Sequence, residues 1–160
     1  MEKKGVFRQK RKFYIMCKAC EVGKHVVNIC VERKYSINTA KLQKLLTLMH
    51  GYHLKSYNEP LFPENIVLWP CGVAIKEVDE KFREFAKSFP QDKLPALLAL
   101  LESEETVIEK VIDEFGNKDV FNINADSRLK MLSEGYSPER KGEVIDNEKI
   151  KKVFSNYELL

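Results

Sequence analysis

The cysteine and histidine side chains near the start of the chain have types and spacings that could support metal or redox chemistry. Cys17 and Cys20 form a Cys-x-x-Cys pair, and His25 and Cys30 follow. Tetrahedral zinc sites favour such a close pair together with a second pair of ligands. His25 and Cys30, however, are five residues apart in a segment with helical periodicity, so their side chains would face different directions. Three hypotheses stay open: a zinc site at Cys17, Cys20 and His25, a redox-active pair, and ordinary buried or half-buried cysteines.

Two further histidines, His50 and His53, are three residues apart on a predicted helix, a spacing that permits a shared face. This helix offers no carboxylate that would complete a metal site, so we expect packing or hydrogen bonding for both. The chain also contains no phosphate-binding loop, no dinucleotide-binding glycine pattern, no His-Glu-x-x-His and no nucleophile elbow. We therefore expect no catalytic residue, no metal, no cofactor and no enzymatic activity.

The segment Thr39–Tyr57 carries both of these histidines and is the element around which we expect the chain to fold. Its apolar residues recur at helical intervals of three and four, and Asn38 precedes it with a side chain suited to an N-cap. The pattern predicts a central, buried helix. A helix-turn-helix interpretation, with residues 35–38 as the turn, competes with this prediction. A helix whose side chains are used for packing could not enter a major groove, which argues against DNA reading.

Periodicity and capping residues place the other elements on either side of the central helix. We expect further helices at residues 25–34, 73–88, 103–115, 119–133 and 148–156, a strand at Ile66–Trp69 and a brief extended segment at Val144–Ile145. The fold class is therefore mainly α: a compact, single-domain helical bundle of about six helices, with a small β element near Ile66–Trp69.

The positive charge of the chain is concentrated in its first residues. The formal net charge is +3, and residues 1–13 carry a local charge of +5, so the remainder carries −2. We expect residues 1–12 to form a flexible basic arm and residues 13–160 to form the single domain. The arm is either a solvated terminus or a contact for phosphates or another acidic surface. No stretch has the roughly 18 apolar residues of a membrane helix, and no signal peptide is evident, so we expect a cytoplasmic protein with reduced cysteines.

A series of spaced motifs links the central helix to the segment that follows it. The series comprises Lys41, Leu42, Gln43, Lys44, Leu45 and Leu46, then Gly51 and Tyr52, then Pro60, Leu61 and Phe62, and finally Trp69 and Gly72. In this order the motifs resemble the Panacea antitoxin domain family, which includes SocA-like antitoxins and phage-associated GepA-type proteins. The resemblance covers roughly residues 24–154. Where the family has Gly-Pro-Val, this chain has Gly72 followed by Val73 and Ala74.

The resemblance implies a compact helical domain that is not an enzyme. Family members are commonly encoded beside a toxin, often in prophages or other mobile elements, and neutralise it by direct binding; some are linked to handing the toxin to a protease. We therefore expect a protein partner, either a toxin or another target such as a host defence factor, and we expect the motif residues to be scaffold. A nucleic-acid-associated regulator that uses the basic arm is the alternative, and a homo-oligomer stays open. The candidate partner-binding residues are Tyr52, Tyr57, Trp69, Arg8 and Arg11.

Overall fold

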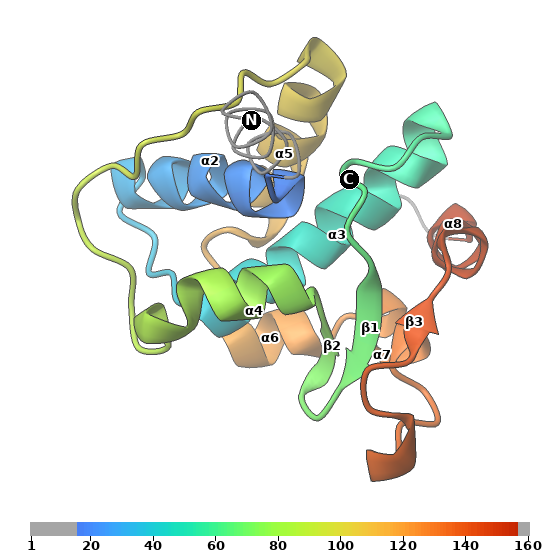
Figure 1. Ribbon diagram of the computed structural model, residues 1–160. Helices are drawn as coiled ribbons and strands as arrows, with labels where there is room; N and C mark the ends of the chain where they lie inside the picture. Colours follow the sequence, from blue (N-terminus) through green and yellow to red (C-terminus); the bar gives the residue numbers. More distant parts are fainter. Residues whose placement is uncertain (1–15, 157–160) are drawn as a thin grey trace, which may run out of the picture.

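The computed structural model describes residues 16–156 (Figure 1). In chain order its elements are α2 (Lys18–Glu32), α3 (Thr39–Tyr57), β1 (Ile66–Trp69), β2 (Gly72–Ala74), α4 (Lys76–Phe82), α5 (Glu102–Phe115), α6 (Val120–Asn124), α7 (Ser127–Leu132), β3 (Val144–Ile145) and α8 (Asn147–Ser155), with 3₁₀ turns at Arg83–Phe85 and Pro138–Arg140. The prediction of a mainly α fold with a small β element is confirmed. The predicted arm, including Arg8 and Arg11, lies outside the described residues, so its partner and nucleic-acid contacts stay predictions.

Helix α3 crosses the centre of the molecule and has the predicted bounds, Thr39–Tyr57 (Figure 1). Asn38 caps its start, because the side-chain oxygen accepts a hydrogen bond of 2.9 Å from the backbone N–H of Lys41. Asn58 ends it in the left-handed conformation, with a φ of 56°. Fourteen of the nineteen residues are buried, and α3 packs against α2, α4, α5, α6 and α8. The polar side chains buried on this helix therefore need partners inside the protein.

The small sheet is antiparallel, with the strand order β2-β1-β3. Val67 pairs with Ala74 on one side and with Val144 on the other, which confirms the predicted extended segment at Val144–Ile145. Our prediction of one helix over residues 73–88 is wrong at both ends, because β2 ends at Ala74 and α4 runs only from Lys76 to Phe82, followed by the 3₁₀ turn Arg83–Phe85. The apolar run suited either structure, and pairing with β1 decided between them.

Two other helices differ from their predicted bounds. Helix α2 begins at Lys18, seven residues earlier than predicted, because the Glu64 carboxylate accepts hydrogen bonds of 3.1 and 2.9 Å from the first two backbone N–H groups. The predicted helix 119–133 is two short helices, α6 and α7, since Asp126 accepts a hydrogen bond from the N–H of Arg128 and starts a new helix. Long-range capping and helix breaks of this kind are not visible in hydrophobic periodicity.

An extended segment, residues 91–101, runs beside α2 and is fixed to it by side chains of that helix. Asn28 bonds to both backbone groups of Leu94, accepting from its N–H at 2.7 Å and donating to its carbonyl at 2.9 Å. His25 donates from Nε2 to the Leu98 carbonyl at 2.7 Å. These bonds satisfy backbone groups that a helix or sheet would otherwise satisfy, so the segment is ordered without regular structure.

The C-terminal helix α8 completes the core beside α3. Asp146 caps the start of this helix, because its side chain accepts a hydrogen bond of 2.8 Å from the N–H of Lys149. Ile150 and Phe154 on its inner face are fully buried. Among the described helices, none has both the length and the apolar character that a membrane crossing requires.

Candidate partner-binding surface

The motif Lys41–Leu46 on α3 is called the family block below. Its polar residues point into the protein and bond to backbone groups. The ammonium group of Lys41 donates to the carbonyls of Ser36 (2.7 Å) and Gly116 (2.6 Å). The Gly116 carbonyl lies at the C-terminal end of α5, where a positive charge is favourable. Gln43 accepts from the N–H of Ile75 at 2.8 Å and donates to its carbonyl at 3.0 Å. These two side chains therefore join α3 to α5 and to the chain that enters α4.

Lys44, the third polar residue of the block, holds the turn between β1 and β2. Its ammonium group donates to the Cys71 carbonyl at 2.6 Å. Gly72 follows with a φ of +123°, and a Cβ atom there would lie 3.0 Å from Lys44 Nζ, so both the backbone and the space disfavour a side chain. Burial lowers the pKa of Lys44 and also that of Lys41. Lys44 of the block and Gly72 of the Trp-x-x-Gly motif are thus parts of one internal contact.

Gly51 and residues of the Pro-Leu-Phe motif also take part in the packing of the core. A Cβ atom at Gly51 would overlap the ring of Phe154, so glycine lets α8 approach α3 this closely. Phe62 stacks on the ring of His50, with 4.4 Å between the ring centroids. The structure buries Leu42, Leu45, Leu46, Leu61 and Phe62 and leaves Pro60 exposed.

The two histidines of α3 have separate partners and do not form a metal pair. His50 Nε2 donates to Asn147 Oδ1 at 3.0 Å, while His53 Nδ1 donates to the Glu59 carbonyl at 2.7 Å. His50 is 1% exposed, and burial lowers its pKa to about 4. Its ring is therefore neutral at pH 7. The expectation of packing and hydrogen bonding for both residues is confirmed.

The Cys17–Cys20 pair lies at the start of α2 and is joined as a disulfide, with the Cα atoms 5.2 Å apart. Our prediction that these cysteines stay reduced is wrong in this structure, because the first turn of a helix brings residues three apart into bonding range. His25 takes no part, since its ring bonds to the Leu98 carbonyl. Within residues 16–156, no group of three or more His, Cys, Asp or Glu side chains is placed to hold a metal ion. The zinc hypothesis therefore has no support in the geometry.

The three aromatic residues predicted to bind a partner do not lie together. Tyr52 is half-buried and its hydroxyl accepts from Lys110 Nζ at 3.3 Å, while Tyr57, five residues later on α3, is 43% exposed. Trp69 is half-buried in the hairpin, with Lys141 Nζ 4.8 Å from the centre of its ring. The hairpin contacts the first half of α3, so the structure separates Trp69 from the two tyrosines.

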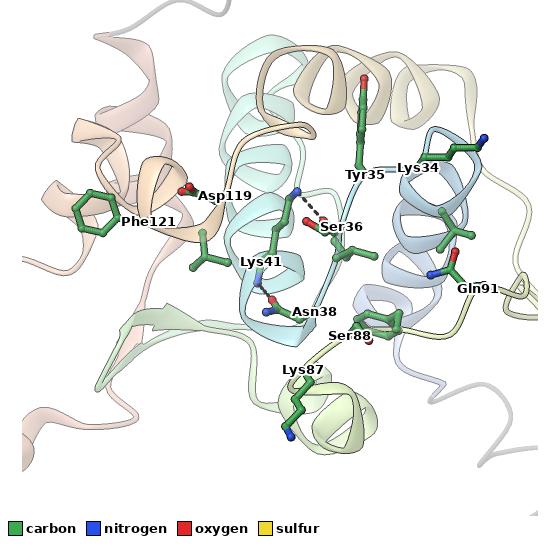
Figure 2. A pocket seen from close by; sticks show the side chains of 14 residues that line it. Lys34, Tyr35, Ser36, Asn38, Lys41, Lys87, Ser88, Gln91, Asp119 and Phe121 are labelled. Atoms are coloured by element: carbon green, nitrogen blue, oxygen red, sulfur yellow. Dashed lines mark hydrogen bonds between the residues drawn. The ribbon is translucent and has the colours of Figure 1, made fainter.

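A groove with a volume of about 800 Å³ lies beside the start of α3 (Figure 2). Three segments that are far apart in the sequence form it: residues 34–38 between α2 and α3, residues 87–91, and residues 119–121 at the start of α6. Ile37 and Phe89 are buried lining residues, and the Phe89 N–H donates to the Ile37 carbonyl at 3.0 Å. The groove is therefore a preformed feature of the fold with an apolar base.

The rim of this groove carries a large exposed aromatic side chain and a few charges. Phe121 on α6 is 82% exposed, more than any other large apolar side chain within the described range. Figure 2 shows its ring at the edge of the groove, across from Lys34 and Lys87. We call these three residues and Asp119 the groove rim; all four are exposed. An exposed aromatic ring beside an apolar hollow is typical of a protein-binding surface.

A second hollow, of about 280 Å³, adjoins the groove at α6, since Val120 lines both. Trp69 lines this second hollow, so the predicted tryptophan and the groove belong to one surface around α6. Sequence reasoning missed Phe121, because a single helix over 119–133 gave no reason to set it apart from the other apolar residues of that segment. The short spacing of the apolar residues was the available signal. Because α6 has only five residues, it buries Ile123 and leaves Phe121 exposed.

Few of the residues that line the groove are charged. Asp119 is the one carboxylate among the described residues that line it, and this side chain caps α6 by accepting from the Asn122 N–H at 2.8 Å. Lys41 also lines the groove, but two backbone carbonyls hold its ammonium group. The remaining lining is mostly apolar or uncharged, which suits the side chains of a protein partner.

A comparison with known protein families found a match that includes two of the three groove segments. The model of the family described as antitoxin SocA-like, Panacea domain, matches residues 42–130, more than half of the 160-residue chain. The chain belongs to this family. The searches of curated proteins and of solved structures found no match. The matched part of the Panacea domain runs from α3 to α7, so it includes the groove segments 87–91 and 119–121 and confirms the resemblance drawn from the spaced motifs.

Proposed function

We propose that the protein is an antitoxin that neutralises a partner toxin by direct protein–protein binding, and that the toxin binds the surface around α6. The observation that carries the proposal is Phe121, which is 82% exposed at the edge of a preformed groove in a chain of the SocA-like antitoxin family. Aromatic anchors in well-shaped hollows dominate the binding energy of many protein interfaces.

Trp69 provides a second anchor on the same surface. It lines two smaller hollows, of about 280 and 350 Å³, and α6 contributes Asn124 to both. Lys34 and Lys87 add positive charge on the side of the groove rim across from the first anchor. A toxin with apolar side chains flanked by carboxylates fits this arrangement, and its association would weaken as salt is added.

The proposal includes three further points that rest on the family resemblance. The protein acts by binding and not by catalysis. It acts in the cytoplasm, where the toxin is made, and it is carried by a phage or another mobile element. A host protein is the alternative target, and it would use the same surface.

The test is co-expression of this protein with each neighbouring reading frame. A product that arrests growth alone and is harmless together with this protein is the toxin, and the two should co-purify. Phe121→Ala should abolish neutralisation and weaken binding at least about tenfold. Leu97→Ala is the matched control, since Leu97 is 67% exposed but belongs to the segment bound to α2.

Two negative outcomes separate the parts of the proposal. If every neighbouring product is harmless, or if its toxicity is unchanged by co-expression, the antitoxin role is wrong. If neutralisation occurs and both Phe121→Ala and Trp69→Ala bind the toxin as tightly as the wild type, the role holds and the toxin binds another surface.

A further inference from the structure

The disulfide at the start of α2 lies outside the groove and has no part in the proposed function. Cys17 is the N-cap of α2 and is half-buried, whereas Cys20 in the first turn is only 3% exposed. Their Cα atoms are 5.2 Å apart, within the usual range for a disulfide. The fold thus holds two sulfur atoms at the separation that bond formation needs, with one accessible to a reagent and the other shielded.

The start of α2 gives the Cys17 sulfur one backbone hydrogen-bond donor. The N–H of Cys20 donates to Cys17 Sγ at 3.0 Å, whereas the two preceding N–H groups donate to the Glu64 carboxylate. The ammonium group of Lys18 is bonded to Glu104 at 2.6 Å, so the Cys20 N–H is the donor that remains to stabilise a negative charge on the sulfur. Helix N-termini stabilise anions, and the thiolate is the reactive form of a cysteine.

We propose that Cys17 and Cys20 are a redox-active dithiol that exchanges with small disulfides of the glutathione type. In the first step the Cys17 thiolate attacks one sulfur of oxidised glutathione, which forms a mixed disulfide and releases one glutathione thiolate. In the second step the Cys20 thiol gives its proton to water, and its sulfur attacks Cys17 Sγ and displaces the second glutathione thiolate. The two thiolates take up protons from water. The dithiol loses two electrons, and one oxidised glutathione becomes two molecules of glutathione.

The burial of the two sulfurs assigns their roles. An incoming disulfide reaches Cys17, because it is the more exposed of the pair. Cys20 Sγ lies 3.5 Å from the Glu77 carbonyl and is shielded from solvent, so it resolves the mixed disulfide from inside. In the reverse direction a thiol attacks the same accessible sulfur, Cys17, and returns the pair to the dithiol.

The two remaining cysteines are internal controls. Cys30 is 0% exposed, and burial raises its pKa to about 11, so it is a poor nucleophile. Cys71 is exposed in the hairpin turn and is a free thiol. Cys71 shows the reactivity of an exposed thiol that has no second sulfur three residues away on a helix.

The first experiment equilibrates the full chain in buffers with different ratios of reduced to oxidised glutathione, then alkylates and counts the free thiols by mass spectrometry. As the buffer becomes more oxidising, two of the four thiols should become protected together, and peptide mapping should place the bond between Cys17 and Cys20. Cys71→Ser should show the same midpoint. Four free thiols at every ratio would overturn the proposal, and this outcome needs no variant at the pair.

The second experiment traps the intermediate in chains that also carry Cys71→Ser, apart from the one chain in which the reactivity of Cys71 itself is measured. With Cys20→Ala, one glutathione should accumulate on Cys17 at a rate well above that of the exposed Cys71 in a Cys17→Ser, Cys20→Ala chain. With Cys17→Ser alone, no adduct should form at Cys20. Serine is a good N-cap, so this variant keeps the start of α2, and circular dichroism verifies the fold of each chain. An adduct on Cys20, or modification of Cys17 no faster than that of Cys71, would also overturn the proposal.

Discussion

Helix α3 and the groove rim lie side by side, but their side chains are used in opposite ways. On α3 the polar residues of the family block bond to backbone groups of other elements, and fourteen of nineteen residues are buried. On the rim, Lys34, Lys87 and Phe121 project into solvent around a hollow. One region holds the fold together, and the other is the surface that we propose for a partner.

This difference shows that the polar residues of the family block on α3 are used to hold the fold together and are not available at the surface. Lys41 and Lys44 look like surface charges in the sequence, yet each is nearly fully buried and holds carbonyl groups of a neighbouring segment. A helix used in this way has few side chains left for a partner. The exposed residues of the neighbouring segments, such as Lys87 and Phe121, can change without loss of the core, whereas Phe89 belongs to it.

The largest effect on stability is expected when a single methyl group is added to α3 at Gly51. Gly51→Ala places a Cβ atom into the Phe154 ring and should reduce the free energy of unfolding by about 3 kcal/mol. Gly23→Ala on α2 is the matched control: its nearest atom, Leu42 Cδ2, would be 3.4 Å away, and alanine favours a helix, so stability should be unchanged or rise by up to about 1 kcal/mol. Urea denaturation measures both, and an equal response of the two variants would contradict the packing argument.

Substitution of two glutamines, one on α3 and one at the groove, compares how much a side chain in each region contributes to stability. Gln43→Ala leaves the buried N–H of Ile75 without its partner, while the Ile75 carbonyl still accepts from the N–H groups of Val78 and Asp79, so the change should cost about 2 kcal/mol. Gln91→Ala removes an exposed side chain at the groove and should change stability by less than about 0.5 kcal/mol. Thermal unfolding of the two variants at the same pH provides the measurement. A small effect at Gln43 would mean that its bonds do not hold α3 to the chain before α4.

The pH dependence of stability tests the burial of His50. Burial lowers its pKa from 6.5 to about 4, so between these values the unfolded chain binds a proton that the folded chain does not. Stability should therefore be lost as the pH falls, by about 2 kcal/mol from pH 7 to pH 5, with no contribution from His50 above pH 7. His50→Gln should flatten the curve in this window. Buried carboxylates such as Glu104, whose pKa is lowered, contribute a loss only at more acidic pH.

The smallest effect on stability is expected at the groove rim. Phe121→Ala removes an 82% exposed ring and should change the free energy of unfolding by less than about 0.5 kcal/mol. The same variant should weaken toxin binding at least about tenfold, as measured by titration calorimetry. A large loss of stability would show that the ring packs against the protein and would remove the contrast with α3.

Local sequence patterns predicted the elements whose buried residues recur at regular intervals along the chain. The bounds of α3, its Asn38 cap, β1 and β3 were all predicted from local patterns, and the structure has them. Elements fixed by distant residues were predicted poorly. The start of α2 depends on Glu64, and β2 forms because it pairs with β1, so periodicity alone misplaced both.

For this protein, the sequence by itself determined the class of fold and the family, because both are carried by local spacing of apolar residues and by short motifs. Only the tertiary structure decided what the polar residues of those motifs do, since bonds such as Lys41 to Gly116 join positions 75 residues apart. It also decided that Phe121 faces solvent beside a groove formed by three separate segments. Exposure and the shape of a hollow arise from packing among distant segments, which periodicity within one segment does not record.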